Sequence, residues 1–192
     1  MNPSARRVPA RRGKRRSLPV GPQGPASREL RIKGAVQVLG RCPGYATKYA
    51  AWSRLIVSYL AALGRPGAGV ELLLVDDAKC LALNASYRGK PEATDILSFP
   101  AVEGAPPAGY RGFLGSLALD LAYAWRHRGR FRRRFEEEAA FLVLHGLLHL
   151  CGHHHDTPAA ERTLWHLQDR LFPPPAPLLA ALRGLRPARR PR

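Results

Sequence analysis

The sequence contains no long apolar run, few acidic residues and few cysteines. No stretch of eighteen apolar residues occurs, so we expect no segment that spans a membrane. No apolar core follows the charges at the N-terminus, which argues against a secretory signal. The three cysteines, Cys42, Cys80 and Cys151, show no CxxC spacing. They indicate free thiols in a reducing compartment, and we expect a cytoplasmic protein.

The shortage of acidic residues leaves a large positive charge. The chain has 31 Lys and Arg against 14 Asp and Glu, a formal net charge of +17. Residues 1–30 carry eight Arg or Lys against one Glu, and residues 183–192 carry five Arg and no acid. This balance favours a polyanionic partner, with nucleic acid the default. The alternative is that the basic ends serve only solubility or nonspecific adhesion.

The composition divides the chain into three parts. Residues 1–30 mix Arg, Pro, Gly and Ser without apolar periodicity, and we predict a disordered basic tail. Residues 31–175 have the length and apolar content of one domain. Residues 176–192 are predicted as a basic C-terminal tail. The Arg-rich, acid-poor start also resembles an organellar transit peptide, so a mitochondrial location is the less favoured alternative.

Hydrophobic periodicity predicts a small α+β fold. Apolar stripes indicate helices, and short apolar runs between turn residues indicate strands. We expect a mostly parallel four-stranded sheet packed with about five helices. The predicted strands are 33–39, 70–75, 96–99 and 114–119, and the predicted helices are 46–62, 78–87, 120–126, a buried one ending near 150, and 159–172. The Gly- and Pro-rich residues 101–113 would join two adjacent strands.

The stretch FLVLHGLLHLCGHHHD at 141–156 predicts a metal site on that buried helix and its C-terminal turn. His145 and His149 are four residues apart and therefore project from one face of a helix. Gly152 tolerates the left-handed conformation that ends a helix, so the chain can turn and bring His155 toward the other two rings. Three neutral imidazoles with a fourth position open form the ligand set of a catalytic zinc ion.

The residue beside the first histidine argues against proteolysis. The spacing of the histidines and of Gly152 matches the long metzincin signature, but position 146 is Gly where such a protease needs Glu as its general base. A glycine inside a helix costs about 1 kcal/mol relative to alanine. We therefore expect Gly146 to allow the close approach of another backbone or of substrate.

Three blocks of the chain resemble the YbeY family of bacterial rRNA-maturation endoribonucleases. The blocks are ELLLVDDAKCLALNASYRGKPEATDILSFP at 71–100, LGSLALDLA at 114–122 and HGLLHLCGHHH at 145–155. The similarity spans roughly residues 33–172. It implies a single-strand-specific, metal-dependent endoribonuclease that acts in 3′-end maturation of small-subunit (16S) rRNA and in ribosome quality control.

The resemblance also assigns residues. It implies one zinc ion per chain on His145, His149 and His155, and a conserved arginine at Arg88. It implies rRNA and the small ribosomal subunit as partners, with no DNA and no membrane. Three departures from the family pattern are His153-His154 before the third ligand, Ser116 in place of the usual Asp, and Cys151 in place of an aliphatic residue. Either His153 or His154 could compete as a ligand.

The chemistry of RNA hydrolysis suggests roles for these side chains. A guanidinium grips two phosphate oxygens at once, so we expect Arg88 to act with His149 in catalysis and to bind substrate. Its alternative role is a surface salt bridge. Asp95, Arg132 and Arg133 are further candidates for substrate binding, although the arginines could form a solvated loop and Asp95 a helix or turn cap. The general base stays open among Asp95, Asp156 and a histidine that is not a ligand.

Two other functions stay open at this point. One is a noncatalytic ribosome-assembly factor, in which zinc is structural and the basic surface binds rRNA. The other is a metalloprotease, which Gly146 and the positive charge make the weaker candidate.

Overall fold

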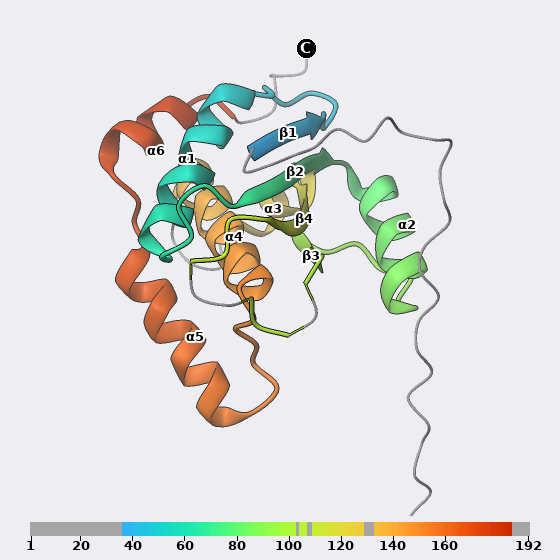
Figure 1. Cartoon of the computed structure of the whole chain (residues 1–192). Helices are drawn as coiled ribbons and strands as arrows, with labels where there is room; N and C mark the ends of the chain where they lie inside the picture. The colour runs from blue at the N-terminus through green and yellow to red at the C-terminus, as the bar shows by residue number, and fades with distance from the viewer. Residues whose placement is uncertain (1–35, 103, 107–108, 129–132, 186–192) are drawn as a thin grey trace, which may run out of the picture. The chain divides into compact units, whose positions relative to one another are not determined.

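The computed structural model describes residues 36–102, 104–106, 109–128 and 133–185 (Figure 1). The described residues form four strands and six helices. The strands are β1 (Val36–Gly40), β2 (Gly69–Val75), β3 (Ile96–Pro100) and β4 (Phe113–Asp120). The helices are α1 (Tyr49–Ala62), α2 (Asp77–Arg88), α3 (Leu121–His127), α4 (Phe135–Leu150), α5 (Pro158–Leu171) and α6 (Ala176–Leu182).

The four strands form one mixed sheet in the order β1-β2-β4-β3. The pairs β1–β2 and β2–β4 are parallel, and β3 is antiparallel to β4. This confirms the mostly parallel four-stranded sheet and the adjacency of the two strands on either side of 101–113. The β2–β4 ladder is irregular at one end, because Gly69 pairs with Phe113 while Val70 pairs with Gly115.

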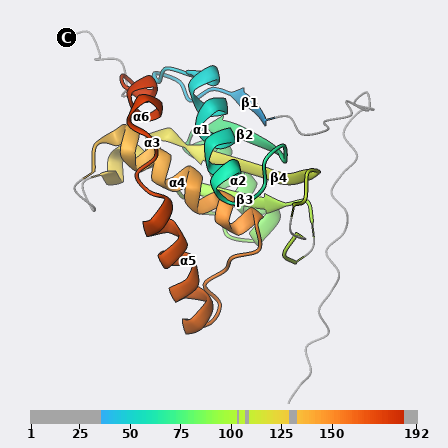
Figure 2. The same cartoon turned by 60° about the vertical axis from the view of Figure 1, so that its left-hand side comes forward.

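Helices cover the two faces of the sheet unequally. One face packs against α1 and α4 and belongs to the main hydrophobic core, while the other packs against α2 over a smaller cluster (Figures 1 and 2). The division follows the alternation of side chains along a strand. In β2, Leu72 and Leu74 join the main core, whereas Leu73 and Val75 belong to the smaller cluster. A strand apolar on both faces is typical of the interior of a parallel sheet.

Several helices begin at side chains that accept hydrogen bonds from free backbone N–H groups. Asp76 accepts from Lys79 at the start of α2, Asp120 accepts from Ala122 and Tyr123 at the start of α3, and Thr157 accepts from Ala160 at the start of α5. Such caps contribute about 1 kcal/mol each. They fix where α2 and α3 leave the sheet.

The C-terminal boundary of the folded part lies beyond the predicted one. Residues 176–192 were expected to be a basic tail, but Ala176–Leu182 form α6. The side chains of Leu179, Leu182 and Leu185 are buried in the main core. Their apolar contacts explain why this short segment, set between a proline run and arginines, folds onto the domain.

Cys42, Cys80 and Cys151 are free and buried. None of the helices in the described ranges is both long and apolar enough to cross a membrane. The predicted tail at 1–30 lies outside the described residues.

Candidate metal centre

Helix α4 carries the first two histidines at the floor of a cavity. The helix is apolar on nearly all sides and buries eleven of its sixteen residues, so its position beneath the sheet is set by packing. His145 and His149 lie on the side that faces the cavity. Gly152 has a left-handed φ of 87°, and a Cβ there would stand 2.6 Å from Ala105 Cα. The turn predicted at this glycine is therefore confirmed.

After this turn the chain brings His155 to the other two rings. The candidate ligand atoms of His145, His149 and His155 all lie within 4.8 Å of one another. The Nε2 atoms of His145 and His149 are 3.1 Å apart. Two nitrogens bound to one tetrahedral zinc at about 2.0–2.1 Å would be about 3.3 Å apart. The three side chains therefore form a group that could hold a metal ion.

The protonation of the rings also fits a metal. Burial lowers the pKa of His145. Burial, followed by the charges of His145 and His155, lowers the pKa of His149 to about 4. Both rings are consequently neutral at neutral pH, and the neutral imidazole is the form that ligates.

Gln168 of α5 orients His145, a role that was not predicted from the sequence. Gln168 is fully buried, and its Nε2 donates to the Phe141 carbonyl at 2.9 Å. Its Oε1 lies 3.0 Å from His145 Nδ1. Because the amide oxygen can only accept, Nδ1 carries the hydrogen, and the lone pair of Nε2 points to the other ligands. A glutamine within an otherwise apolar helical stripe was the available signal.

We expect Gln168→Leu to weaken metal binding by about 10–100-fold, the usual effect of losing a hydrogen-bond partner behind a ligand. Leucine keeps much of the buried volume but releases the His145 ring. Competition with a chromophoric chelator measures the change. Gln37→Leu in β1 is the matched control and should bind metal as the wild type does. Equal affinity in Gln168→Leu would show that the ring is oriented by other contacts.

The three histidines open onto a hollow of about 540 Å³, which we call the histidine cavity. Its wall includes Arg88 and Asp95, two of the four side chains predicted to bind substrate. Its lining residues are Arg88, Thr94, Asp95, Ile96, Ser98, Pro100, His145, His149, His154, His155 and Asp156. Residues from α2, β3, α4 and the connection to α5 thus converge at one place.

Arg88 and Asp95 reach this cavity from different elements. Arg88 is the last residue of α2 and is exposed, so its guanidinium can meet a ligand. Asp95 precedes β3, and its Oδ1 accepts from Ile96 N at 2.8 Å and from Thr94 Oγ1 at 3.1 Å. Asp95 therefore acts as a local cap, the alternative considered from the sequence, while it also lines the cavity.

The other histidines differ in position. His154 is exposed and lines the histidine cavity, whereas His153 is half-buried and is not among the lining residues. Burial lowers the pKa of His153, and the charges of Arg65 and His154 lower it further. Neither joins the group of three whose ligand atoms converge within the described residues.

Arg133 lies away from the histidine cavity, at the opposite end of α4. Its guanidinium stands over the Phe141 ring at 3.8 Å from the centroid and forms an ion pair with Glu138 at 3.3 Å. It lines a second hollow together with Arg128 and Arg134. The structure thus does not bring Arg133 to the metal group. Arg132, the other predicted substrate contact of this segment, lies outside the described residues.

The expectation for Gly146 needs a partial correction. Gly146 makes room for the sheet and not for substrate, because a Cβ there would meet the Leu117 and Ile96 side chains at 2.8 and 3.0 Å. The glycine lets α4 approach the sheet closely. Ser116, which replaces the usual Asp of the resembled family, lines a different hollow on the α2 side of the sheet. Position 116 is therefore not part of the histidine cavity.

Comparison with known proteins gives one consistent family. The family model described as Endoribonuclease YbeY matches residues 45–174. Curated proteins named Endoribonuclease YbeY are similar to the chain. That of Anaeromyxobacter sp. (strain Fw109-5) is 42% identical over 132 residues, 69% of this chain and 67% of the relative. That of Myxococcus xanthus (strain DK1622) is 37% identical over 135 residues, 69% of this chain and 44% of the relative.

A third relative is covered more fully, and a solved structure shares the fold. The Endoribonuclease YbeY of Moorella thermoacetica is 40% identical over 128 residues, 62% of this chain and 81% of the relative. The solution structure of TM1509 from Thermotoga maritima matches with a TM-score of 0.52 and 21% sequence identity. The match covers 78% of this chain and 89% of that one, and it concerns the fold alone.

Proposed function

The chain belongs to the YbeY endoribonuclease family, and from that premise we propose that it cleaves RNA by hydrolysis in the processing of rRNA. The proposal rests on the observation that a possible metal site and an exposed arginine line the same cavity. His145, His149 and His155 could hold a metal, and the exposed Arg88 lines the same hollow. A cation and a guanidinium side by side suit a phosphodiester, whose charge grows as it is attacked.

We propose zinc as the ion, one per chain, because three neutral imidazoles with an open fourth position are typical of catalytic zinc. When bound, zinc supplies Lewis acidity and makes water a nucleophile near neutral pH. The protein contributes the orientation of His145 through Gln168, and a cavity lined by residues of several elements. Asp95, His154 and Asp156 line that cavity and are the groups able to accept a proton.

The finer features of the function are part of the same proposal. We propose single-stranded RNA near the 3′ end of small-subunit rRNA as the substrate, and a role in ribosome quality control in the cytoplasm. The net charge of +17 supports a polyanionic partner. The direct test is a defined single-stranded RNA incubated with the metal-loaded protein and with a chelated control, followed by mapping of the product ends. Metal-independent products, or none, would contradict the proposal.

The cleanest single-residue test is Arg88→Lys. Lysine keeps the charge but loses the fork that binds two phosphate oxygens. We expect metal content and melting temperature to stay near wild type, affinity for RNA to change little, and single-turnover cleavage to fall about a hundredfold, as for the loss of one preorganised donor. Arg54→Lys on the exposed side of α1 is the matched control.

The two possible losses in Arg88→Lys separate enzyme from binding protein. A loss in turnover alone means that Arg88 acts mainly in the transition state. Equal losses in affinity and cleavage would make Arg88 a general RNA contact and would favour the noncatalytic assembly factor. Unchanged cleavage would remove Arg88 from the mechanism.

A further inference from the structure

A smaller hollow adjoins the histidine cavity, and we call it the side cavity. It measures about 260 Å³ and is lined by Asn84, Arg88, Lys90, Glu92, Ala93, Thr94 and Tyr123. Arg88 and Thr94 line both hollows, so the two hollows meet at these residues. A strand whose phosphate is bound at Arg88 can therefore continue into the side cavity.

The wall of the side cavity offers the groups that bind a nucleotide. Arg88 and Lys90 are exposed cations, suited to phosphate, and Tyr123 supplies an aromatic ring. Asn84 is only 4% exposed, and its Nδ2 donates to the Glu92 carbonyl at 2.8 Å. That bond fixes the orientation of the amide. Its buried Oδ1 is left without a hydrogen-bond partner in the described part of the chain.

An unpaired buried acceptor has a physical cost that a ligand can relieve. Leaving such a group unsatisfied is unfavourable, and a ligand N–H or O–H would satisfy it. Single-stranded bases carry N–H donors on their pairing edges, whereas a base in a duplex has that edge occupied. Asn84 therefore gives the side cavity a reason to prefer an unpaired base.

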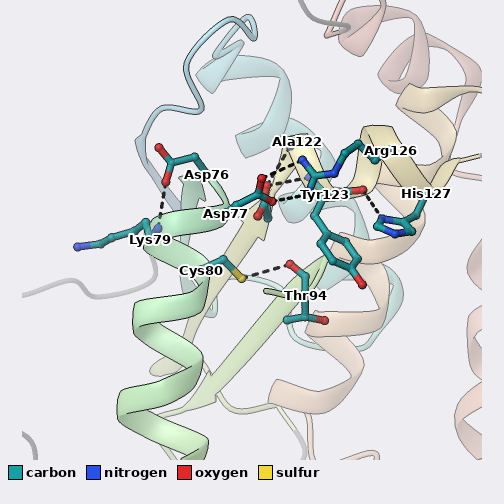
Figure 3. A network of polar contacts seen from close by, with 10 residues as sticks. Asp76, Asp77, Lys79, Cys80, Thr94, Ala122, Tyr123, Arg126 and His127 are labelled. Atoms are coloured by element: carbon teal, nitrogen blue, oxygen red, sulfur yellow. Dashed lines mark hydrogen bonds and ion pairs between the residues drawn. The ribbon is translucent and has the colours of Figure 1, made fainter. Parts of the chain in front are cut away.

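The Tyr123 ring is held in place by contacts on α3 (Figure 3). It stacks on His127 with ring centroids 4.1 Å apart and planes at 27°. The backbone N–H of Tyr123 donates to Asp120 Oδ1. Arg126 binds the Asp77 carboxylate of α2 through its two terminal guanidinium nitrogens. These contacts join α3 to α2, the helix that carries Asn84 and Arg88. The aromatic wall and the phosphate-binding residue are thus positioned relative to each other before RNA arrives.

We propose that the side cavity binds one nucleotide of the RNA strand, adjacent to the phosphate held by Arg88. The base lies against Tyr123 with a donor directed to Asn84, and Lys90 neutralises the neighbouring phosphate. The volume suits a single nucleotide, since pockets for whole drug-sized ligands measure about 300–1,000 Å³. The inference rests on the proposed function and adds a binding site for one nucleotide beside the cut.

The test combines a variant with an altered RNA. Short single-stranded RNAs, each with one abasic position moved stepwise along both sides of the cut, are cleaved under single-turnover conditions. With the wild type we expect one abasic position next to the cut to slow cleavage about tenfold, the usual size of one base–aromatic stack. Tyr123→Leu should slow cleavage of the intact RNA by a similar factor and lose its sensitivity to that abasic position.

Two matched variants control for the fold and for hydroxyl chemistry. Tyr123→Phe keeps the ring and should behave as the wild type. Tyr49→Leu removes an exposed tyrosine from the start of α1 and should change nothing. If Tyr123→Leu slows cleavage of the intact RNA and of every abasic RNA by the same factor, the inference is overturned. The dissociation constants for the same RNAs give a second readout. If Tyr123→Leu and the abasic position are coupled in binding but no RNA is cleaved, the side cavity is supported and the proposed function is contradicted. Absence of coupling in both measurements would overturn the side cavity.

Discussion

His149→Ala should remove the metal and reduce RNA cleavage by about a thousandfold or more. His149 Nε2 lies 3.1 Å from His145 Nε2. His149 is one of only three converging ligands in the described part of the chain, so no spare donor replaces it. A metal ion contributes several kcal/mol to the transition state, and each 1.4 kcal/mol or so is a factor of ten in rate. Metal content by elemental analysis and single-turnover cleavage on the same preparation measure both effects.

The neighbouring histidines are the controls for this result. His153→Ala and His154→Ala should retain one metal ion per chain, because neither side chain belongs to the converging group. If His154→Ala loses the metal while His155→Ala keeps it, the ligand assignment is displaced by one residue. If His149→Ala loses the metal but still binds rRNA and supports ribosome assembly, the noncatalytic alternative gains support.

Gly115→Ala should lower the free energy of unfolding by about 3 kcal/mol or more, the sum of backbone strain and overpacking. Gly115 has a φ of 140°, and a Cβ there would lie 2.3 Å from the Phe99 carbonyl oxygen, in the backbone of the paired strand. The backbone of a hydrogen-bonded strand cannot move aside as easily as a flexible side chain can. The midpoint of urea unfolding, at constant slope, measures the change.

Gly44→Ala separates the two causes. Gly44 also has a left-handed φ, of 82°, but no described atom lies within 4 Å of a Cβ at that position. The change should cost only the conformational penalty of about 1–2 kcal/mol. Equal destabilisation by both substitutions would mean that the contact with Phe99 contributes nothing.

The parts of the site that local spacing determines were predictable. Two histidines four apart on an apolar helix and a glycine three residues later specify a geometry within one helix and one turn, and the structure has that geometry. The mostly parallel sheet followed in the same way from short apolar runs separated by helical stripes. Arg88 could be assigned only through the family resemblance, since many exposed arginines follow helices.

The missed features depend on contacts between distant segments. Gln168 lies 23 residues from His145 in sequence, and only the packing of α5 on α4 brings them together. Arg133 was grouped with its neighbours by charge, while its place is set by Glu138 and the Phe141 ring. Helix α6 was overlooked because prolines and arginines surround its few leucines, whose burial depends on a core built by other elements.

Because His155 lies on the connection between α4 and α5, a metal ion held by the three histidines would also be a cross-link between these helices. Helix α5 has only Leu164 and Gln168 fully buried, so it has little apolar area to hold it against the domain. Two ligands on α4 and one just before α5 would tether that connection, and Gln168 adds a second attachment. A metal ion binds only when the three histidines lie together, so it opposes the local opening of α5, and more so as more of the protein is metal-bound. Loss of the ion would therefore loosen α5 first, and amide hydrogen exchange along this helix would report how much of the protein is metal-loaded.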